Sequence, residues 1–369
     1  MHPLIALDFN LGHDLERAIR RVVDENQAFC VLDPRTSPRR RREHLNLLGA
    51  TTVLDETGST PRLGGSMVDD EIGLVMLTSG SSGDPKAVEL TWDALRASAE
   101  MTQANLRAGA PPVWYPCLPA SHIGGLAVLL RAVLGDASLL WGRADDLVTA
   151  PSRGATHVAV VRAQLARYDL SAFERVLLGG ARPASVLGEN VVTTWGMTET
   201  GSGIVHDGYP LPGVEVASID GELCLRSPTL FRSYRSLPRP SRIGPDGRDD
   251  WFPTGDGGSV LDGRVSVHGR LGFVINTGGE KVWPEDLETI LATVEGVRDV
   301  AVTGIEDPEW GQRVVALVVG DGSNHDESLR DAASERIGPW AKPKEIRYVA
   351  AIPRTDSGKI RRGELSYLF

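Results

Sequence analysis

The residues from Thr78 to Lys86 read Thr-Ser-Gly-Ser-Ser-Gly-Asp-Pro-Lys, so hydroxyl groups, glycines and one ammonium group share a short loop. Glycine lets backbone N–H groups approach an anion closely, and hydroxyl and ammonium groups donate hydrogen bonds to its oxygens. This chemistry suits a polyphosphate. We therefore expect a phosphate cradle made by Thr78, Ser79, Gly80, Ser81, Ser82, Gly83 and Lys86. An ordinary Ser/Gly turn between two strands is the alternative.

The loop differs from the two most familiar nucleotide-binding loops. Lys86 is followed by Ala87, and the Gly-Lys pair at Lys359 is followed by Ile360, so neither place fits G-x-x-x-x-G-K-[ST]. No G-x-G-x-x-G opens a helix after a strand. These observations disfavour a P-loop NTPase and a dinucleotide-binding Rossmann domain.

Three further segments carry residue types suited to nucleotide chemistry. Thr194–Glu199 combines the aromatic plane of Trp195 with hydroxyl groups and a carboxylate. Asp256 ends a Thr-Gly-Asp turn and can accept hydrogen bonds from two ribose hydroxyls, and Lys359 lies in a Gly/Ser-rich loop. Each residue also has a structural interpretation: Trp195 as core, Glu199 as a helix N-terminal charge, Asp256 as a turn carboxylate and Lys359 as a solvated lysine.

Composition limits the classes of protein that these residues serve. The chain has 369 residues, 41% hydrophobic and 24% charged, which is enough for two globular domains. Its net charge of −10 gives no electrostatic attraction for nucleic acid or for an anionic membrane. The basic run Arg39–Arg42 is expected on a solvated helix face, with a nucleic-acid patch as the alternative.

Cysteine usage and hydropathy indicate the compartment. Cys30, Cys117 and Cys224 are scattered without metal-ligand spacing, which favours a reducing environment. No charged region followed by an apolar core opens the chain, and the longest apolar stretch, Ile123–Leu134, is interrupted by Arg131. That stretch is too short to cross a bilayer. We expect a soluble cytoplasmic protein.

Alternating strand-like and helical patterns position these residues. An amphipathic helix is expected over Thr91–Arg107, with Thr91 as its N-cap and Asp93 in its first turn, and a buried helix over Leu126–Leu134. Such alternation predicts α/β layers. The expected strands are Ile72–Thr78, Val88–Leu90, Val113–Pro116, Thr156–Val161, Arg175–Leu178 and Val191–Thr194.

The pattern changes after about Trp251. A Pro/Gly-rich stretch leads to short strands and two helices, which together predict a β-rich α+β domain of about 100 residues. The expected fold is therefore a large layered α/β domain over residues 1–269 and a smaller α+β domain over residues 270–369. The expected elements of the second part are strands Arg264–Arg270, Phe273–Asn276, Val300–Gly304, Val314–Val319 and Arg347–Ala350, a helix from Pro284 and a helix over Asp326–Ile337.

Taken together, these segments resemble the adenylate-forming superfamily of acyl-CoA synthetases, peptide-synthetase adenylation domains and luciferases. The resemblance covers the chain from about Val31 to its C-terminus. Its segments are Thr78–Lys86, Pro116–Gly125, Gly179–Pro183, Thr194–Glu199, Gly221-Glu222-Leu223, Trp251–Asp256, Gly269-Arg270, Gly278-Gly279 and Pro353–Lys359. Within the superfamily the chain looks most like the short o-succinylbenzoate–CoA ligases of actinobacterial menaquinone biosynthesis, on the segments Ser121–Leu129, Trp195–Gly208 and Gly311–Ala316.

The resemblance implies a two-step reaction with ATP, Mg²⁺ and coenzyme A. A carboxylate attacks the α-phosphate, pyrophosphate leaves, and the thiol of coenzyme A then displaces AMP from the acyl-adenylate. Positioning and neutralisation of developing negative charge dominate such chemistry. The implied ligands are Thr198 and Glu199 for the metal, Gly180, Ala181, Arg182, Trp195 and Gly196 for the adenine, Asp256 for the ribose and Arg270 for ribose or phosphate. Lys359 would bridge the attacking carboxylate and the α-phosphate.

The resemblance also implies sites for the acid and for coenzyme A. His122 would border the acyl pocket, and a second carboxylate would be held by Arg182, Gln164, Thr200 or Ser202; a helix-capping or core histidine is the alternative for His122. Gly278 and Gly279 would approach the pantetheine arm. The smaller domain would act as a mobile lid, carrying Lys359 and swinging about a hinge at Gly272, where relatives often have Asp or Lys.

Several alternatives remain for the substrate and the acceptor. Peptide-synthetase domains usually place an aspartate in the segment around His122, and none occurs between Val113 and Leu134, which disfavours an amino-acid substrate. A ligase for another aromatic or short carboxylic acid, an adenylate-forming enzyme with a non-CoA acceptor, and a non-catalytic nucleotide-binding relative remain open. Homo-oligomerisation is expected from the resemblance alone.

Overall fold

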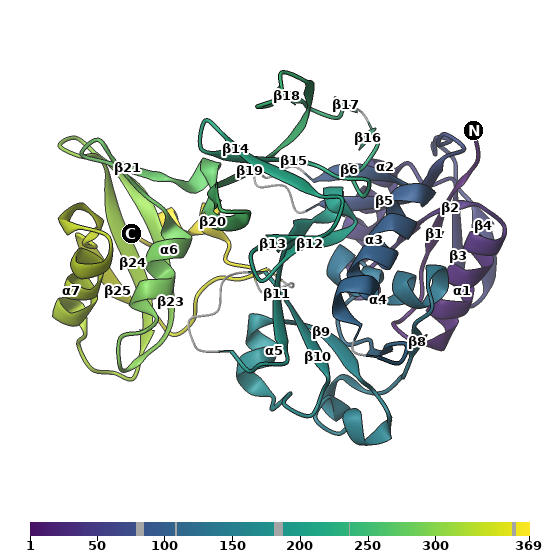
Figure 1. The fold of residues 1–369 in the computed structure, drawn as a ribbon, viewed down its shortest axis with the longest axis horizontal. Helices are drawn as coiled ribbons and strands as arrows, with labels where there is room; N and C mark the ends of the chain where they lie inside the picture. Colours follow the sequence, from purple (N-terminus) through teal and green to yellow (C-terminus); the bar gives the residue numbers. More distant parts are fainter. Residues whose placement is uncertain (79–84, 108, 181–186, 236, 356–358) are drawn as a thin grey trace. The chain divides into compact units, whose positions relative to one another are not determined.

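The computed structural model describes residues 1–78, 85–107, 109–180, 187–235, 237–355 and 359–369 (Figure 1). The chain divides into two compact units. The large unit comprises Met1–Gly179, Gly188–Val216 and Leu225–Phe252, and the small unit comprises Gly180–Leu187, Ala217–Cys224 and Pro253–Phe369.

Two sheets form the framework of the large unit. The first has the order β17-β16-β6-β5-β2-β1-β3-β4, with a parallel centre made by β3, β1, β2 and β5. The second has the order β13-β12-β11-β10-β9-β7-β8 and is parallel from β11 to β8. The strands of the first are β1 Leu4–Leu7, β2 Ala28–Val31, β3 Thr52–Asp55, β4 Gly58–Pro61, β5 Ile72–Thr78, β6 Lys86–Thr91, β16 Ser233–Tyr234 and β17 Leu237–Pro238. Those of the second are β7 Val113–Tyr115, β8 Ser138–Leu139, β9 His157–Val161, β10 Arg175–Gly179, β11 Val191–Met197, β12 Ser202–His206 and β13 Tyr209–Pro210.

Helices cover these sheets and confirm the expected α/β layers. α3 (Trp92–Leu106) contacts β5, β6 and β12, and α4 (Ile123–Leu134) contacts α3, β8, β9 and β12, so the two lie side by side between the sheets (Figure 1). α1 (His13–Asp24) contacts α4 as well as β1 and β2. α2 (Pro38–Leu48) packs on β5 and β6, and α5 (Arg162–Arg167) on β9 and β10.

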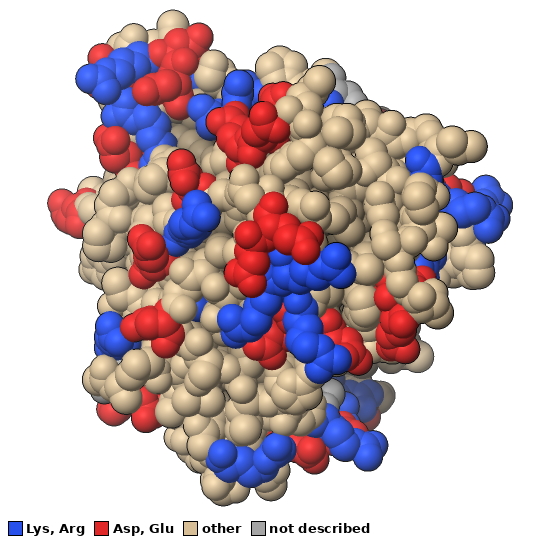
Figure 2. Space-filling model, turned by 90° about the vertical axis from the view of Figure 1, so that its right-hand side faces the viewer, with Lys and Arg blue, Asp and Glu red and all other residues tan. Residues whose placement is uncertain are grey.

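The basic run lies on the solvent-facing side of α2, as expected. Ser37 caps the helix, while Leu45 and Leu48 from its last turns enter the core. Arg39 pairs with Glu43, and Arg41 pairs with Asp8. On the face of the molecule in Figure 2, basic and acidic side chains lie close to one another. No helix of the described residues is both long and apolar enough to cross a membrane.

A third sheet is formed by strands between residues 215 and 270. Its order is β14-β15-β19-β18, and β20 pairs with β19. The strands are β14 Glu215–Ile219, β15 Glu222–Arg226, β18 Arg242–Ile243, β19 Asp249–Leu261 and β20 Arg264–Arg270. The predicted domain boundary, at the end of β20, stays a prediction.

The small unit has its own α+β core. The hairpin of β23 (Val297–Asp307) and β24 (Gly311–Gly320) is flanked by β25 (Glu345–Tyr348), β21 (Ile275–Thr277) and β22 (Glu280–Val282). α6 (Pro284–Leu291) and α7 (Asp326–Arg336) cover one face of the hairpin, where Val300 and Val302 point. The opposite face, at Ala301, packs against α8 (Arg362–Leu365).

Several expected elements differ in extent. The strand expected at Val88–Leu90 begins at Lys86, so this lysine belongs to a strand end. The helix expected from Leu126 begins at Ile123, β11 continues through Met197, and a 3₁₀ turn over Leu271–Phe273 precedes β21. Before Ile72 the sequence suggested only the helix of the basic run; β1 to β4 and α1 are additional.

Candidate active site

The phosphate-loop prediction falls on the connection between β5 and β6. Thr78 and Lys86 are cross-strand partners at the ends of these strands, and the Thr78 hydroxyl donates to the Lys86 carbonyl oxygen at 3.4 Å. The strand pair thus brings the two ends of the loop together. The predicted ligands Ser79, Gly80, Ser81, Ser82 and Gly83 lie outside the described residues.

The predicted metal ligands stand on the turn that joins β11 to β12. A Cβ added to Gly196 would lie 2.3 Å from the Ser202 carbonyl oxygen, so only glycine allows this close approach of the strands. The chain then forms a 3₁₀ turn over Thr198–Thr200. Carboxylate and hydroxyl oxygens are hard ligands that fit Mg²⁺ bound mainly by phosphates. Among the described residues, no group of three or more His, Cys, Asp or Glu side chains is arranged to hold a metal ion.

Tyr234 contacts both of these regions. Its hydroxyl donates to Glu199 Oε1 at 3.0 Å, and the Lys86 Nζ lies 5.0 Å from the centroid of its ring. The sequence did not indicate a role for Tyr234, because this residue lies outside the phosphate-loop, metal-ligand and ribose segments.

The predicted ribose and phosphate residues meet in the small unit. Asp256 on β19 and Arg270 on β20 are cross-strand partners, and Asp256 Oδ1 lies 2.9 Å from Arg270 Nε. Arg270 also donates to the Thr254 carbonyl oxygen at 2.9 Å. The Thr-Gly-Asp segment lies within β19 and not in the turn that the sequence suggested, because Asp256 pairs with β20. Gly255 has a left-handed φ of 76°, and its N–H donates to Glu222 Oε1 at 2.8 Å. Glu222 therefore supports this part of β19, which residue patterns did not predict.

The predicted acid-binding residues differ in their surroundings. His122 is the N-cap of α4, and its backbone accepts from Leu126. Gln164 reaches the loop before α4 through its contact with Cys117, at 3.7 Å. The buried Thr200 hydroxyl donates to the Ser202 carbonyl oxygen at 2.7 Å and so stabilises its own turn. Ser202 is buried as well, and its hydroxyl accepts from Arg131 at 3.3 Å.

Arg131 is the most unusual buried group near these residues. Its side chain lies in α4 with 2% of the residue exposed, and its guanidinium stacks 4.7 Å from the Trp114 ring centroid. Nε and Nη1 have no hydrogen-bond partner among the described residues. Burial lowers the pKa of Arg131 to about 9, so the group stays charged at neutral pH. In the sequence, Arg131 is recognisable only as a charged residue that interrupts an apolar run. That interruption is the one feature that could have pointed to a buried charge.

His206 on β12 adds a neutral acceptor to the same region. Its Nδ1 lies 2.6 Å from Asn105 Oδ1, whereas Nε2 has no partner among the described residues. Burial, aided by the charge of Arg131, lowers the pKa of His206 to about 4. The cross-strand neighbour Thr194 also has a buried hydroxyl without a described partner. We call Arg131, Ser202, His206 and Thr194 the Arg131 cluster.

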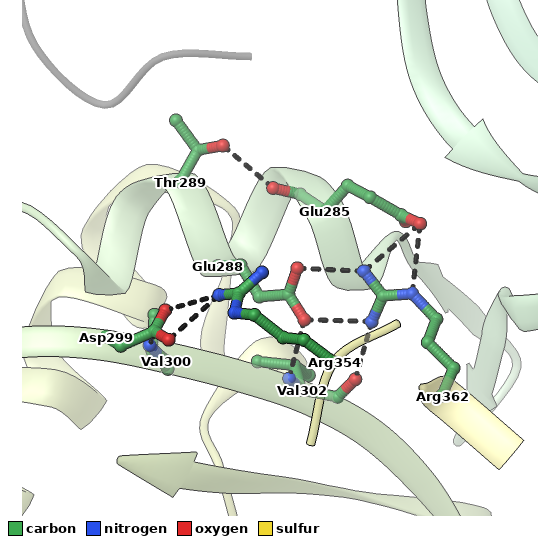
Figure 3. A network of polar contacts seen from close by, with 8 residues as sticks. All are labelled: Glu285, Glu288, Thr289, Asp299, Val300, Val302, Arg354 and Arg362. Atoms are coloured by element: carbon green, nitrogen blue, oxygen red, sulfur yellow. Dashed lines mark hydrogen bonds and ion pairs between the residues drawn. The ribbon is translucent and has the colours of Figure 1, made fainter. Parts of the chain in front are cut away.

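The loop that carries Lys359 is held at both ends within the small unit. The Thr355 N–H donates to the Lys359 carbonyl oxygen at 2.8 Å, and Arg354 binds both oxygens of Asp299 at 2.7 and 2.8 Å. On the other side Arg362 binds Glu285 and Glu288 of α6 (Figure 3). Residues 356–358 lie outside the described part of the chain.

The remaining predicted residues are glycines and their neighbours. Gly278 and Gly279 form the turn between β21 and β22, with φ of 60° and 86°, as a two-residue type I′ hairpin requires. Gly272 lies in the 3₁₀ turn before β21, with open space where a Cβ would be. Gly180 follows β10 with φ of 95°, and Ala181 and Arg182 lie outside the described residues.

Comparison with known proteins identifies the family. The AMP-binding enzyme model matches residues 62–235, and the model of the AMP-binding enzyme C-terminal domain matches residues 286–359. A probable 2-succinylbenzoate–CoA ligase of Mycobacterium tuberculosis is 36% identical, over 94% of this chain and 93% of its own length. The chain belongs to the AMP-binding, adenylate-forming enzyme family. The expected resemblance is thereby confirmed.

Further members of the AMP-binding family are similar in sequence or in fold. The 2-succinylbenzoate–CoA ligase of Enterococcus faecalis is 30% identical, over 79% of this chain and 69% of its own. The o-succinylbenzoate CoA synthetase of Bacillus subtilis, solved with its acyl-adenylate intermediate, has a TM-score of 0.83 at 24% identity, covering 98% of this chain and 88% of that one. MatB from Rhodopseudomonas palustris, solved with ATP, has a TM-score of 0.84 at 19% identity, covering 100% and 89%. These structures confirm the predicted fold.

Proposed function

We propose that this chain is an o-succinylbenzoate–CoA ligase. It joins o-succinylbenzoate to coenzyme A with conversion of ATP to AMP and diphosphate, through an acyl-adenylate, and supplies menaquinone biosynthesis. The observation that carries the proposal is the 36% identity to a probable 2-succinylbenzoate–CoA ligase over nearly the whole length of both chains.

In the first step the described residues bind and orient the reactants. Thr78 and Lys86 hold the phosphates that leave, Thr198 and Glu199 hold Mg²⁺, and Asp256 accepts from the ribose hydroxyls. Bound Mg²⁺ neutralises charge that develops on the phosphate oxygens. Lys359 stabilises the transition state between the acid and the α-phosphate, because a compact permanent charge suits that task.

The adenine, acid and coenzyme A assignments are proposals of the same kind. Gly180, Ala181, Arg182, Trp195 and Gly196 border the adenine, and His122 and Gln164 border the acid. Arg270 lies beside ribose or phosphate, and Gly278 and Gly279 approach pantetheine. The proposal also includes that the enzyme is cytoplasmic, forms homo-oligomers and does not bind nucleic acid.

The Arg131 cluster supports a substrate with a second carboxylate. o-Succinylbenzoate carries an aromatic carboxylate besides the one that reacts, and such a group needs a cation or hydrogen bonds when it is enclosed. Arg131 is a buried cation with two guanidinium nitrogens that lack described partners, and Ser202 lies beside it. We therefore assign the aromatic carboxylate to Arg131, with Ser202 as a neighbouring donor.

An Arg131→Met variant tests this assignment, since methionine fills space without a charge. We expect the KM for o-succinylbenzoate to rise about 10- to 100-fold, the range of a charge-assisted hydrogen bond. The KM for 4-oxo-4-phenylbutanoate, which lacks the aromatic carboxylate, should stay within a few-fold. Arg107→Met, at the end of α3, is the surface control. An equal change for both acids would contradict the assignment.

A pyrophosphate-release assay with a panel of carboxylic acids, with and without coenzyme A, tests the function as a whole. We expect o-succinylbenzoate to give the fastest release and coenzyme A to discharge the adenylate as a thioester. Faster release with another acid would replace the substrate. Discharge only by a different acceptor would replace the second step, and no release with any acid would favour a non-catalytic nucleotide-binding protein.

A further inference from the structure

We propose that Tyr234 is a positioning residue that holds Lys86 and Glu199 in register for Mg·ATP. This role rests on the proposed function, because it takes Lys86 as a phosphate ligand and Glu199 as a metal ligand. Two different parts of one side chain make the two contacts. The hydroxyl donates to Glu199 Oε1 at 3.0 Å, and the ring face receives the Lys86 ammonium at 5.0 Å from its centroid.

The main chain around Tyr234 is tied to both partners. On one side β16 pairs with β6, in a register that places Tyr234 opposite Val88. On the other side the Phe231 N–H donates to the Glu199 carbonyl oxygen at 2.8 Å. The segment therefore connects the strand that begins at Lys86 with the turn that carries Glu199.

Side chains next to Tyr234 reinforce this frame. Arg235 forms an ion pair with Glu89 of β6 at 3.0 Å, and both side chains are at least 85% buried. The Ser233 hydroxyl donates to the same carboxylate at 2.9 Å. The Phe231 ring, fully buried, packs against the Tyr234 ring with centroids 4.8 Å apart. Strand pairing, the ion pair beside it and ring packing on Phe231 thus hold Tyr234 in place.

The chemistry of a tyrosine suits this place. An ammonium and a carboxylate attract each other, and direct pairing would withdraw both from phosphate and metal. A phenol hydroxyl donates to the carboxylate and orients it, while the electron-rich ring face attracts the ammonium. Lys86 is exposed and Glu199 is half-buried, so both remain accessible to a ligand. Tyr234 therefore keeps two opposite charges ordered without neutralising them.

Two variants separate the two contacts. Tyr234→Phe keeps the ring against Lys86 and Phe231 and removes only the hydrogen bond to Glu199. Tyr234→Leu removes both contacts. The exposed Tyr209 of β13, changed to Phe, is the matched control for loss of a tyrosine hydroxyl.

Calorimetric titration of ATP into each protein, at a series of Mg²⁺ concentrations, gives a readout that does not depend on turnover. For Tyr234→Phe we expect the Mg²⁺ concentration that gives half-maximal ATP affinity to rise about 10-fold, the scale of one hydrogen bond to a charged group. ATP affinity at saturating Mg²⁺ should recover to that of the unmodified protein. For Tyr234→Leu, ATP affinity should stay reduced even at saturating Mg²⁺, because the Lys86 contact is lost too.

The two half-reactions give the second measurement. Acid-dependent pyrophosphate release by Tyr234→Phe should fall and be restored by added Mg²⁺, whereas thioester formation from supplied acyl-adenylate should be unchanged, because it uses neither the metal nor the leaving phosphates. Unaltered Mg²⁺ dependence of ATP binding in Tyr234→Phe would overturn the role of Tyr234. An equal loss in both half-reactions would overturn it too. Failure of the unmodified protein to release pyrophosphate with any acid would instead refute the proposed function, while the calorimetric comparison still decides on Tyr234.

Discussion

His206 shows how one buried side chain makes the stability of the large unit depend on pH. Its folded-state pKa of about 4 lies below the ordinary value of 6.5, because the imidazole is buried near Arg131. Above pH 6.5 the ring is neutral in both the folded and the unfolded chain. As the pH falls from 6.5 to 4, the unfolded chain takes up a proton that the folded chain does not, so the free energy of unfolding decreases.

A His206→Gln variant should remove this part of the pH dependence. The unmodified protein should lose on the order of 3 kcal/mol between pH 7 and pH 4 through this group, and the variant should not. Urea unfolding at several pH values measures the difference between the two proteins. The exposed His13, changed to Gln, is the control. Parallel pH profiles of the His206→Gln variant and the unmodified protein would contradict the expectation.

At this scale the sequence predicted residues whose role follows from local chemistry. Thr91 was expected to cap α3, and its hydroxyl accepts from the Ala94 N–H at 3.1 Å. The sequence did not predict the roles of Tyr234 and Arg131, because these roles depend on partners far along the chain and on burial. The apolar run around Arg131 predicts a helix. It does not show that the arginine side chain itself is buried.

Among the elements, the loop that carries Lys359 depends most clearly on its neighbours. Arg362 begins α8 with 8% of its side chain exposed, and its two terminal nitrogens each bind one oxygen of Glu288 at 2.8 Å (Figure 3). It also donates to Glu285 and to the Val302 carbonyl oxygen. Burial raises the pKa of Glu285, and the charge of Arg362 opposes that rise. The network therefore fixes α8 to α6 and β23 just after Lys359.

An Arg362→Met variant should lower adenylation by at least about 10-fold and retain thioester formation from supplied acyl-adenylate, because the proposed mechanism uses Lys359 only in adenylation. It should also lose about 3 to 5 kcal/mol of stability, since Glu288 would be left buried without its partner. Single-turnover assays of each half-reaction, together with urea unfolding, measure both effects.

A double variant separates loop position from folding. Arg362→Met combined with Glu288→Gln should recover much of the stability but little of the adenylation. The exposed Arg336 of α7, changed to Met, is the control. Full recovery of adenylation in the double variant would show that the network serves folding alone.

Periodicity predicted the elements better than their ends. The ranges Ile72–Thr78 and Arg264–Arg270 agree with β5 and β20. The start of β6 at Lys86 did not follow from the pattern, since Lys86 continues the strand through pairing with Thr78. Hydrophobic periodicity reports which residues are buried, whereas strand ends depend on the neighbouring strand.

For the molecule as a whole, the proposed reaction requires the small unit to serve two half-reactions. Gly272, the predicted hinge, lies in the 3₁₀ turn over Leu271–Phe273, and a Cβ there would meet nothing within 4 Å. Its backbone is outside the left-handed region, so alanine fits this conformation. The conformation of this structure therefore does not require glycine at position 272. A hinge that adopts a second backbone conformation would give the glycine a function.

Gly272→Pro should impair thioester formation more than adenylation, because proline fixes φ and restricts the residue before it. Gly272→Ala should keep adenylation unchanged and serves as the conservative variant. Rates of the two half-reactions, measured separately, test this expectation. An equal loss in both by Gly272→Pro would count against a hinge at this residue.

At the largest scale the sequence predicted the classes of both parts, and the boundary that it places between residues 269 and 270 stays a prediction. It did not indicate that an earlier segment groups with the later part. The segment Ala217–Cys224 belongs to the small unit, although residues of the large unit flank it. Such membership depends on long-range contacts that neither composition nor periodicity reports. The motif order, in contrast, was sufficient to predict the family.

The buried, incompletely bonded Arg131 sets a conflict between thermal robustness and recognition. A desolvated cation with two nitrogens that lack partners in the described part of the chain costs stability, which a well-packed apolar side chain would restore. Selection for heat resistance alone would thus replace Arg131 early, and the proposed discrimination among acids would be lost with it. Substitutions that raise the melting temperature of the ligand-free protein should therefore identify side chains that lower stability and that are candidates for ligand binding.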